Sequence, residues 1–238
     1  MNVLAIVAAR GGSKGLPNKN ILPLCGSPVI CYTIDDALES ELCDKVVCTT
    51  DDERIAAIAA RTGIEVINRP ARLARDDSPI EEALRHAVAC VEADDDFMPD
   101  IIVSLNGNVP VRADGIIDKA VSLLIETDAD AVITVTDVGH YHPNWMLEID
   151  GTGRIAYYKS GCIYRRQELP ACYVHDGAVA AVKRHVMMVR HPKTTLYSWM
   201  GEDIRAVMQR PHETVDIDDE YDFMLAEAII RARERVLV

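Results

Sequence analysis

The amino-acid sequence predicts an α/β fold in which a mostly parallel sheet is flanked by helices. Short apolar runs such as Val3–Ala9 are continuous rather than alternating, which is typical of strands buried on both faces. Through residue 136 these runs alternate with amphipathic or Ala-rich segments of helix length. With 238 residues, 49% of them hydrophobic and 26% charged, the chain is long enough to bury a full core as one domain.

Each predicted element follows from this alternation. After the first strand, further strands are predicted at 45–50, 65–68, 100–105 and 130–136, and helices at 29–39, 52–61, 80–93 and 114–127. Thr50-Asp51-Asp52-Glu53 fits a capping box before the second helix, and Ser78-Pro79 suits the cap and first turn of the third. Ligands of such a fold are expected at the carboxyl ends of the strands.

The pattern changes at 138–174, which is rich in Tyr, His, Pro and Gly and lacks a helical period. We interpret 1–238 as a single domain and 138–174 as an inserted β-hairpin arm or lid, with a turn at "DGTG", 150–153. The regular pattern returns at 176–184. A final helix is predicted at about 219–233, with one apolar face made by Met224, Leu225, Ala228 and Ile229.

Charge and composition exclude several classes of partner. The formal net charge of −13 argues against a nucleic-acid polymer, and no apolar run reaches the ~18 residues of a spanning helix. The N-terminus lacks a basic segment ahead of an apolar one, so we expect a cytoplasmic protein without membrane contact. The 7 cysteines are scattered without metal-like spacing, which favours reduced, structural thiols.

The stretch "ARGGSKGLPNKN", residues 9–20, follows the first strand directly and holds Arg10, Lys14 and Lys19 without an acidic residue. Backbone N–H groups in such a loop can form an anion nest, and we expect its glycines to permit close approach and positive φ. It matches neither a Walker A loop nor a dinucleotide fingerprint, since Pro17 breaks any early helix and Asn20-Ile21 is expected to continue extended. A phosphate site is favoured over a Gly-rich turn with solvated lysines.

The stretch "ETVDIDDEYD", residues 213–222, carries the second signal. If it is extended, Val215 and Ile217 face one way and Asp216 and Asp218 the other. Two adjacent anions favour a divalent ion, and we expect Mg²⁺, which takes oxygen ligands. The alternative is that Asp218 or Asp219 simply caps the last helix.

A basic loop and a carboxylate pair suit phosphoryl chemistry, in which catalysis is mostly positioning and charge neutralisation. In order and over essentially its whole length, the chain resembles the acylneuraminate (sialic acid type) cytidylyltransferases, with a nucleotide-diphospho-sugar transferase-like, Rossmann-like fold. The motifs that carry the resemblance are "ARGGSKGLPNKN", "TTDDERIA", "RPARLARDDS", "DGAV" and "DIDDEYD".

The resemblance implies attack of a sugar hydroxyl on the α-phosphate of CTP, giving a CMP-sugar and pyrophosphate, with Mg²⁺ as cofactor. It also implies a homodimer formed through the arm. Catalytic roles fall to Arg10, Lys19, Asp216 and Asp218, the last two as Mg²⁺ ligands. Nucleotide-binding roles fall to Ala8, Arg10, Gly11, Gly12, Ser13, Lys14, Gly15, Asn20, Arg69 and Asp76, and sugar-binding roles to Asn106, Arg112, Trp145 and Asp176.

The residues expected to contact the sugar depart from the family pattern. The chain has "LNGNVPVR" (105–112) where the family usually has L-Q-P-T-S-P-L-R. Trp145 and Val174 stand where sialic acid enzymes carry a Lys and an Arg that hold the sugar's carboxylate. Two alternatives therefore stay open: a nucleotidyltransferase with a changed sugar or base, and a non-catalytic nucleotide-sugar binding protein.

Overall fold

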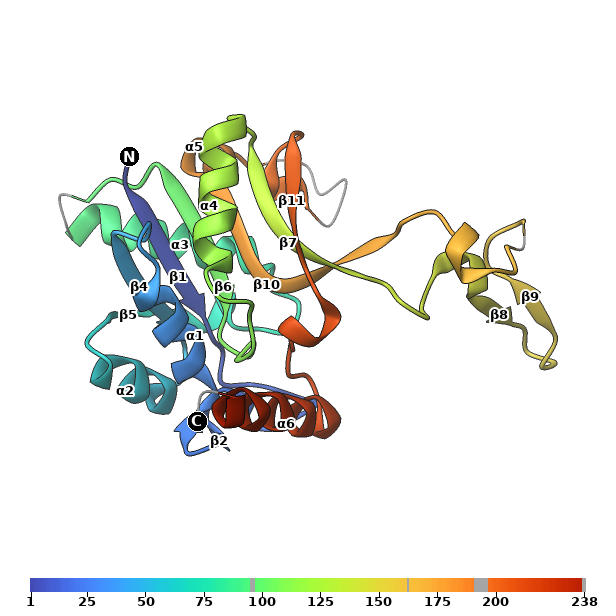
Figure 1. Ribbon diagram of the computed structural model, residues 1–238. Coiled ribbons are helices and arrows are strands. Elements are labelled where there is room, and N and C mark those ends of the chain that lie inside the picture. Colours follow the sequence, from blue (N-terminus) through green and yellow to red (C-terminus); the bar gives the residue numbers. More distant parts are fainter. Residues whose placement is uncertain (95–96, 162, 191–196, 237–238) are drawn as a thin grey trace.

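A seven-stranded sheet in the order β11-β7-β10-β6-β1-β4-β5 forms the centre of the protein (Figure 1). This computed structural model describes residues 1–94, 97–161, 163–190 and 197–236. Strand β10 runs antiparallel to β6 and β7, and the remaining neighbours are parallel, so the predicted mostly parallel sheet is confirmed. The strands of the sheet are β1 Val3–Ala8, β4 Lys45–Thr50, β5 Glu65–Asn68, β6 Ile101–Asn106, β7 Ala131–Asp137, β10 Tyr173–Lys183 and β11 Ile204–Gln209.

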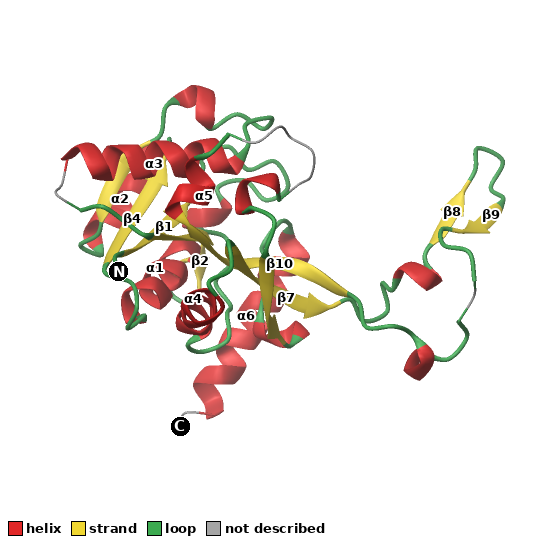
Figure 2. Ribbon diagram, turned by 90° about the horizontal axis from the view of Figure 1, so that it is seen from above, coloured by secondary structure: helices red, strands yellow, loops and turns green. Residues whose placement is uncertain are grey.

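Helices cover both faces of the sheet (Figure 2). Val3, Ala5 and Val7 of β1 pack with α1, α2 and α4, whereas Leu4 and Ile6 pack with α3 and α5 on the opposite face. This alternation of two buried faces explains why the strand sequences are continuously apolar. The helices are α1 Val29–Glu39, α2 Glu53–Arg61, α3 Ile80–Asp94, α4 Ile116–Thr127, α5 Arg184–Met188 and α6 Glu220–Val236.

The predicted strand boundaries agree with the structure to within one residue. The predicted cap of α2 was displaced: Asp52, not Thr50, is the N-cap, and its carboxylate accepts from the backbone N–H groups of Arg54 and Ile55. The hydroxyl of Thr50 instead accepts from the backbone N–H of Asp52 at 3.1 Å.

Helix α6 lies across the end of the sheet at which β1 ends (Figure 1). Its predicted apolar face is only partly right: Ile229 packs on the protein, whereas Met224 and Leu225 are exposed. The buried side chains of the helix are Ala226 and Ile230. These contact a separate small cluster that also contains Leu24, Val29, Val111, Val215 and Ile217. The helix therefore packs on the loops that follow the strands, rather than on the sheet itself.

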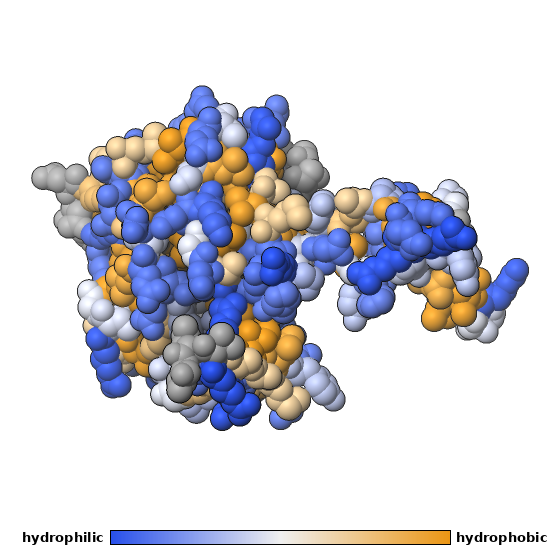
Figure 3. Space-filling view, viewed as in Figure 1, coloured by the Kyte–Doolittle hydropathy of each residue, from blue (hydrophilic) through white to orange (hydrophobic). Residues whose placement is uncertain are grey.

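Strands β7 and β10 lead out of the sheet into a projecting segment that holds the hairpin β8 Leu147–Ile149 and β9 Ile155–Tyr157 (Figure 1). Its apolar side chains gather at the tip (Figure 3). Leu147, Ile149, Ile155 and Tyr157 are 50–70% exposed. The short elements outside the sheet are β2 Pro23–Leu24, β3 Ser27–Pro28 and the 3-10 turns η1 Lys19–Ile21, η2 Ala71–Leu73, η3 Pro143–Trp145, η4 Arg166–Glu168, η5 Ser198–Met200 and η6 Pro211–Glu213.

Among the helices of the described segments, none combines the length and the apolar character needed to cross a membrane.

Candidate functional site

A cavity of about 360 Å³ lies at the carboxyl ends of β1 and β6. This is where ligands of open α/β sheets are expected. The segment after β1, the segment after β6 and the stretch before α6 all contribute to it, although they are far apart in sequence. Its walls are Ala8, Ala9, Arg10, Ser13, Lys14, Gly15, Lys19, Asn20, Arg69, Ile80, Asn106, Asn108, Asp216 and Asp218.

The glycines of the loop after β1 do not adopt positive φ, so the expectation of positive φ is wrong. Two of them are needed because other atoms approach their Cα closely. A Cβ on Gly11 would lie 2.6 Å from Oδ2 of Asp52, and one on Gly15 would collide with the carbonyl oxygen of Asp218. A Cβ on Gly12 would meet no atom within 4 Å. The left-handed residue of this loop is Asn18, with φ 59°.

Two backbone donors of the predicted anion nest are already engaged. The N–H of Gly11 donates to Oδ1 of Asp51 at 3.0 Å, and the N–H of Ser13 donates to the carbonyl of Gly11 at 3.1 Å. The expected extended run at Asn20-Ile21 is also wrong, because residues Lys19–Ile21 form the 3-10 turn η1. This turn buries Asn20, whose amide donates to the carbonyl of Arg10 at 3.1 Å and so fixes the backbone at the start of the loop.

The cationic side chains of the loop are paired with carboxylates. Arg10 and Lys14 contact Asp76 at 2.9 and 2.5 Å, and the hydrogen bond from Lys14 is the largest cause of a lowered pKa of Asp76. Lys19 donates to Oδ1 of Asp218 at 2.8 Å and to the carbonyl of Ile217 at 2.7 Å. An incoming triphosphate would compete with these carboxylates for the same cations.

The carboxylate pair has the alternation that its sequence predicts. Val215 and Ile217 are buried in the cluster under α6, while Asp216 and Asp218 line the cavity. The amide of Asn108 donates to Oδ1 of Asp216 and, at 2.9 Å, to the carbonyl of Ile217. Burial, and next the negative charge of Asp218, raise the pKa of Asp216 to about 6.

The capping alternative holds for a neighbouring aspartate. Oδ1 of Asp219 accepts from the backbone N–H groups of Tyr221 and Asp222 at 2.8 and 3.0 Å, in the first turn of α6. Capping of the last helix therefore accounts for Asp219 and leaves the carboxylates of Asp216 and Asp218 directed to the cavity.

The donor set fits a hard divalent cation that is shared with a phosphate ligand. Within the described segments, no cluster of at least three His, Cys, Asp or Glu side chains is arranged around a common metal position. Asp216 and Asp218 supply carboxylate oxygens. Burial and the charge of Asp218 raise the pKa of Asp216, so a cation beside it would favour its ionised form. Mg²⁺ is commonly bound by one or two carboxylates, with substrate phosphates and water completing the octahedron.

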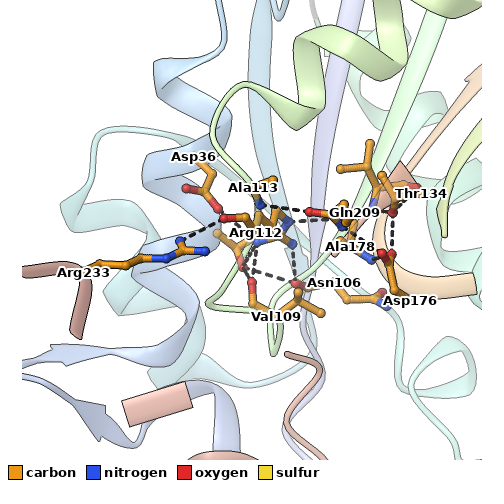
Figure 4. Close-up of polar contacts among 12 residues, drawn as sticks. Asp36, Asn106, Val109, Arg112, Ala113, Thr134, Asp176, Ala178, Gln209 and Arg233 are labelled. Atoms are coloured by element: carbon orange, nitrogen blue, oxygen red, sulfur yellow. Dashed lines mark hydrogen bonds and ion pairs between the residues drawn. The ribbon is translucent and has the colours of Figure 1, made fainter. Parts of the chain in front are cut away.

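Arg112, which is predicted to contact the sugar, lies inside the scaffold and is not one of the residues that line the cavity (Figure 4). Its side chain is 1% exposed. The guanidinium donates to the carbonyls of Asn106, Val109 and Ala178 and also contacts Thr33 and Asp36. Because its donors are directed at these partners, Arg112 holds the loop after β6.

The other predicted sugar contacts are divided between the cavity and the arm. Asn106 lines the cavity and donates to the carbonyl of Gly177 at 3.2 Å. Asp176 precedes Gly177 on β10 and is not itself one of the residues that line the cavity. Trp145 is in the projecting segment, where its indole N–H donates to the carbonyl of Ile163 at 2.8 Å, so the structure does not bring it to the cavity of its own chain. Sequence reasoning missed Asn108 as a cavity residue, although a polar side chain just after β6 was available as a signal.

Comparisons with known proteins identify the family of the chain. The sequence profile of a family described as "Cytidylyltransferase" matches residues 4–229. An N-acylneuraminate cytidylyltransferase of Escherichia coli O18:K1:H7 is 30% identical over 98% of this chain and 53% of its own length, so this chain spans about half of that relative. A CMP-N,N'-diacetyllegionaminic acid synthase of Legionella pneumophila is 28% identical over 100% of both chains.

The fold is also that of a solved structure, a CMP:2-keto-3-deoxy-manno-octonic acid synthetase complexed with CTP. The TM-score is 0.75 at 18% identity, and the match covers 98% of this chain and 100% of the other. At this identity the likeness concerns the fold alone. The family profile over 4–229 is the decisive comparison, and it shows that the chain belongs to the cytidylyltransferase family.

Proposed function

We propose that this protein transfers CMP from CTP to a hydroxyl group of a sialic acid-like or related sugar acid, releasing pyrophosphate. The observation that carries the proposal is that one cavity is lined by the three cations Arg10, Lys14 and Lys19 and by the carboxylates of Asp216 and Asp218. Membership of the cytidylyltransferase family and the sugar-acid names of the relatives support it.

In this reaction the sugar hydroxyl oxygen forms a bond to the α-phosphorus of CTP while the bond to the β-phosphate oxygen breaks. The proton of the hydroxyl leaves to solvent or to a nearby base, and pyrophosphate departs. Arg10 and Lys14 exchange Asp76 for phosphate oxygens, and Lys19 faces the developing charge. Most of the catalytic effect then comes from positioning and charge neutralisation rather than from a reactive side chain.

A Mg²⁺ ion held by Asp216 and Asp218 would supply Lewis-acid polarisation of the phosphate oxygens. The protein's own contribution is to keep these carboxylates in place. Asn108 donates to Asp216, and Lys19 donates to Asp218 and to the carbonyl between the two aspartates. Asp216 must be ionised to bind the cation, so binding is favoured above its pKa of about 6.

We further propose a cytoplasmic homodimer whose arm, 138–174, contacts the second copy. The exposed apolar tip of the arm supports an interface, since such side chains are costly to leave in water. Cys25, Cys31, Cys43, Cys48 and Cys172 are thiols rather than disulfides, which fits a reducing compartment.

The test is pyrophosphate release from CTP and Mg²⁺ with a panel of sugars. The panel holds N-acetylneuraminic acid, N,N'-diacetyllegionaminic acid, 2-keto-3-deoxy-manno-octonic acid and neutral N-acetylmannosamine. We expect release with at least one sugar acid, its loss with EDTA or in Lys19→Ala, and its retention in the control Lys119→Ala, which changes an exposed lysine. Release from another nucleotide in preference to CTP would favour the changed-base alternative. CTP binding without turnover of any sugar would favour a binding protein.

A further inference from the structure

Gln209, the last residue of β11, is buried at 4% exposure, and both ends of its amide are engaged (Figure 4). Its Oε1 accepts from the backbone N–H of Ala113 at 2.9 Å. Its Nε2 donates to Oδ2 of Asp176 at 2.8 Å. Gln209 therefore connects the loop after β6 to the strand that carries Asp176.

The orientation of this amide is dictated by the backbone. An N–H group can only donate, so Ala113 requires the oxygen of Gln209 and leaves its NH₂ group to face Asp176. On its other side, Oδ1 of Asp176 accepts from the backbone N–H of Ala178 at 3.1 Å and from the hydroxyl of Thr134 at 2.5 Å. Both carboxylate oxygens of Asp176 thus accept from donor groups. The Gln209 amide cannot turn its oxygen toward Asp176 without losing its hydrogen bond to Ala113, and the backbone N–H of Ala178 can only donate.

An ionised carboxylate satisfies both sides, and an amide at position 176 does not. An asparagine could give its oxygen to Ala178, but its NH₂ would then point at the NH₂ of Gln209. We propose that Gln209 is a positioning residue that fixes Asp176 as an acceptor-only group beside the cavity, where it accepts a hydrogen bond from the acceptor sugar. The last step of this inference rests on the proposed function.

The backbone next to Asp176 borders the cavity. Asp176 directly precedes Gly177, whose carbonyl accepts from Asn106 and whose position leaves 3.2 Å between a built Cβ and Oδ2 of Asp216. The bulge in the pairing of β10 with β7, between His175 and Ala180, brings this turn out of the ladder.

An ionised carboxylate has about four acceptor positions, and three hydrogen bonds to Asp176 are formed within the protein. The remaining capacity suits a hydroxyl or an ammonium group of the sugar. The negative charge of Asp176 would repel a carboxylate of the sugar. We therefore expect the sugar to turn a hydroxyl or amino substituent, and not its acid group, toward Asp176.

The test is a polarity swap in the full-length protein, with Asp176→Asn, Gln209→Glu and the double variant. Each single change places like groups against each other, and we expect each to lower the melting temperature by about 4–8 °C. In the double variant the new carboxylate accepts from both Ala113 and the new asparagine, so most of the loss is recovered. Asp176→Asn combined with Gln167→Glu has the same net charge, and because Gln167 is an exposed arm residue, that control should not recover stability.

Steady-state kinetics with CTP and N-acetylneuraminic acid, or whichever panel sugar is turned over, tests the reading of the substrate. We expect Asp176→Asn to raise the KM for the sugar about tenfold and to leave the KM for CTP within about twofold. The double variant should keep the raised sugar KM although its stability is restored, because position 176 then presents an N–H donor.

Additive losses of stability in the double variant would overturn the pairing of Gln209 with Asp176. A KM for CTP that rises as much as the KM for the sugar would overturn the sugar contact. The unfolding measurements need no substrate and decide the pairing by themselves. Absence of turnover in the wild-type protein would instead contradict the proposed function.

Discussion

Replacing Asp216 by asparagine should stabilise the metal-free protein while abolishing metal-dependent turnover. The pKa of Asp216 is raised from 3.8 to about 6 by burial and by the charge of Asp218. A folded pKa above the unfolded value means that the folded state binds the extra proton between pH 4 and 6. The stability contributed by this group is therefore present below about pH 4 and is lost as the pH rises through 6.

The magnitude follows from the two pKa values. A difference of about 2 units corresponds to about 3 kcal/mol, the upper limit of what ionised Asp216 costs the metal-free fold at neutral pH. Asp216→Asn keeps an Oδ1 acceptor for the amide of Asn108 and removes the charge. At pH 7.5 we expect its free energy of unfolding to exceed that of the wild type by about 1–3 kcal/mol, and the difference to vanish near pH 4.

The assay is urea unfolding at pH 4, 5.5 and 7.5 in EDTA, with Asp77→Asn as a control. Asp77 is exposed and paired with Arg75, so its replacement should change stability by less than about 1 kcal/mol at each pH. If Asp216→Asn is less stable than the wild type at pH 7.5, the carboxylate makes net stabilising contacts. The picture of an uncompensated metal ligand is then refuted.

Three further substitutions test the site geometry. Gly15→Ala should weaken CTP binding about tenfold or more in calorimetry, because its Cβ collides with the Asp218 carbonyl. Gly12→Ala is the control in the same loop, since a Cβ there has open space. Equal effects of the two substitutions on CTP binding would refute this distinction. Gly177→Ala should lower the free energy of unfolding by about 1 kcal/mol or more, since φ is +73° and its Cβ would press on Asp216 and Asn106. Gly151→Ala is the control: its Cβ meets open space, so the free energy of unfolding should not fall. Arg112→Lys should lower the free energy of unfolding in urea by about 3 kcal/mol or more, because a lysine cannot replace the hydrogen bonds of the buried guanidinium. A stable variant with a raised KM for the sugar would instead support the predicted substrate contact.

The strands and the helices on the sheet could be predicted because each leaves a local pattern. The continuous apolar run of β1 reflects burial on two faces, and its neighbours repeat that pattern. The approximate boundaries of α6 were predictable, but its packed face was not. The helix packs on loops rather than on the sheet, so Ala226 and Ile230 are buried while Met224 and Leu225 are exposed.

The loop and the carboxylates of the candidate site were predictable from their positions after strands, but their mutual contacts were not. Lys19 and Asp218 are 199 residues apart and meet only because both stretches end at the same edge of the sheet. Local sequence gave no sign that Arg112 would be buried or that Gln209 would orient Asp176, since both depend on long-range hydrogen bonds.

The most direct test of the central claim is to follow two labels of CTP in parallel reactions with Mg²⁺ and the sugar panel. Attack at the α-phosphorus predicts that label from the α-phosphate appears in a CMP-sugar and label from the γ-phosphate appears in pyrophosphate, in equal amounts. Both products should disappear in Asp216→Asn. Release of the γ-label as inorganic phosphate, or an unchanged yield from Asp216→Asn, would contradict the assignment of this cavity to cytidylyl transfer.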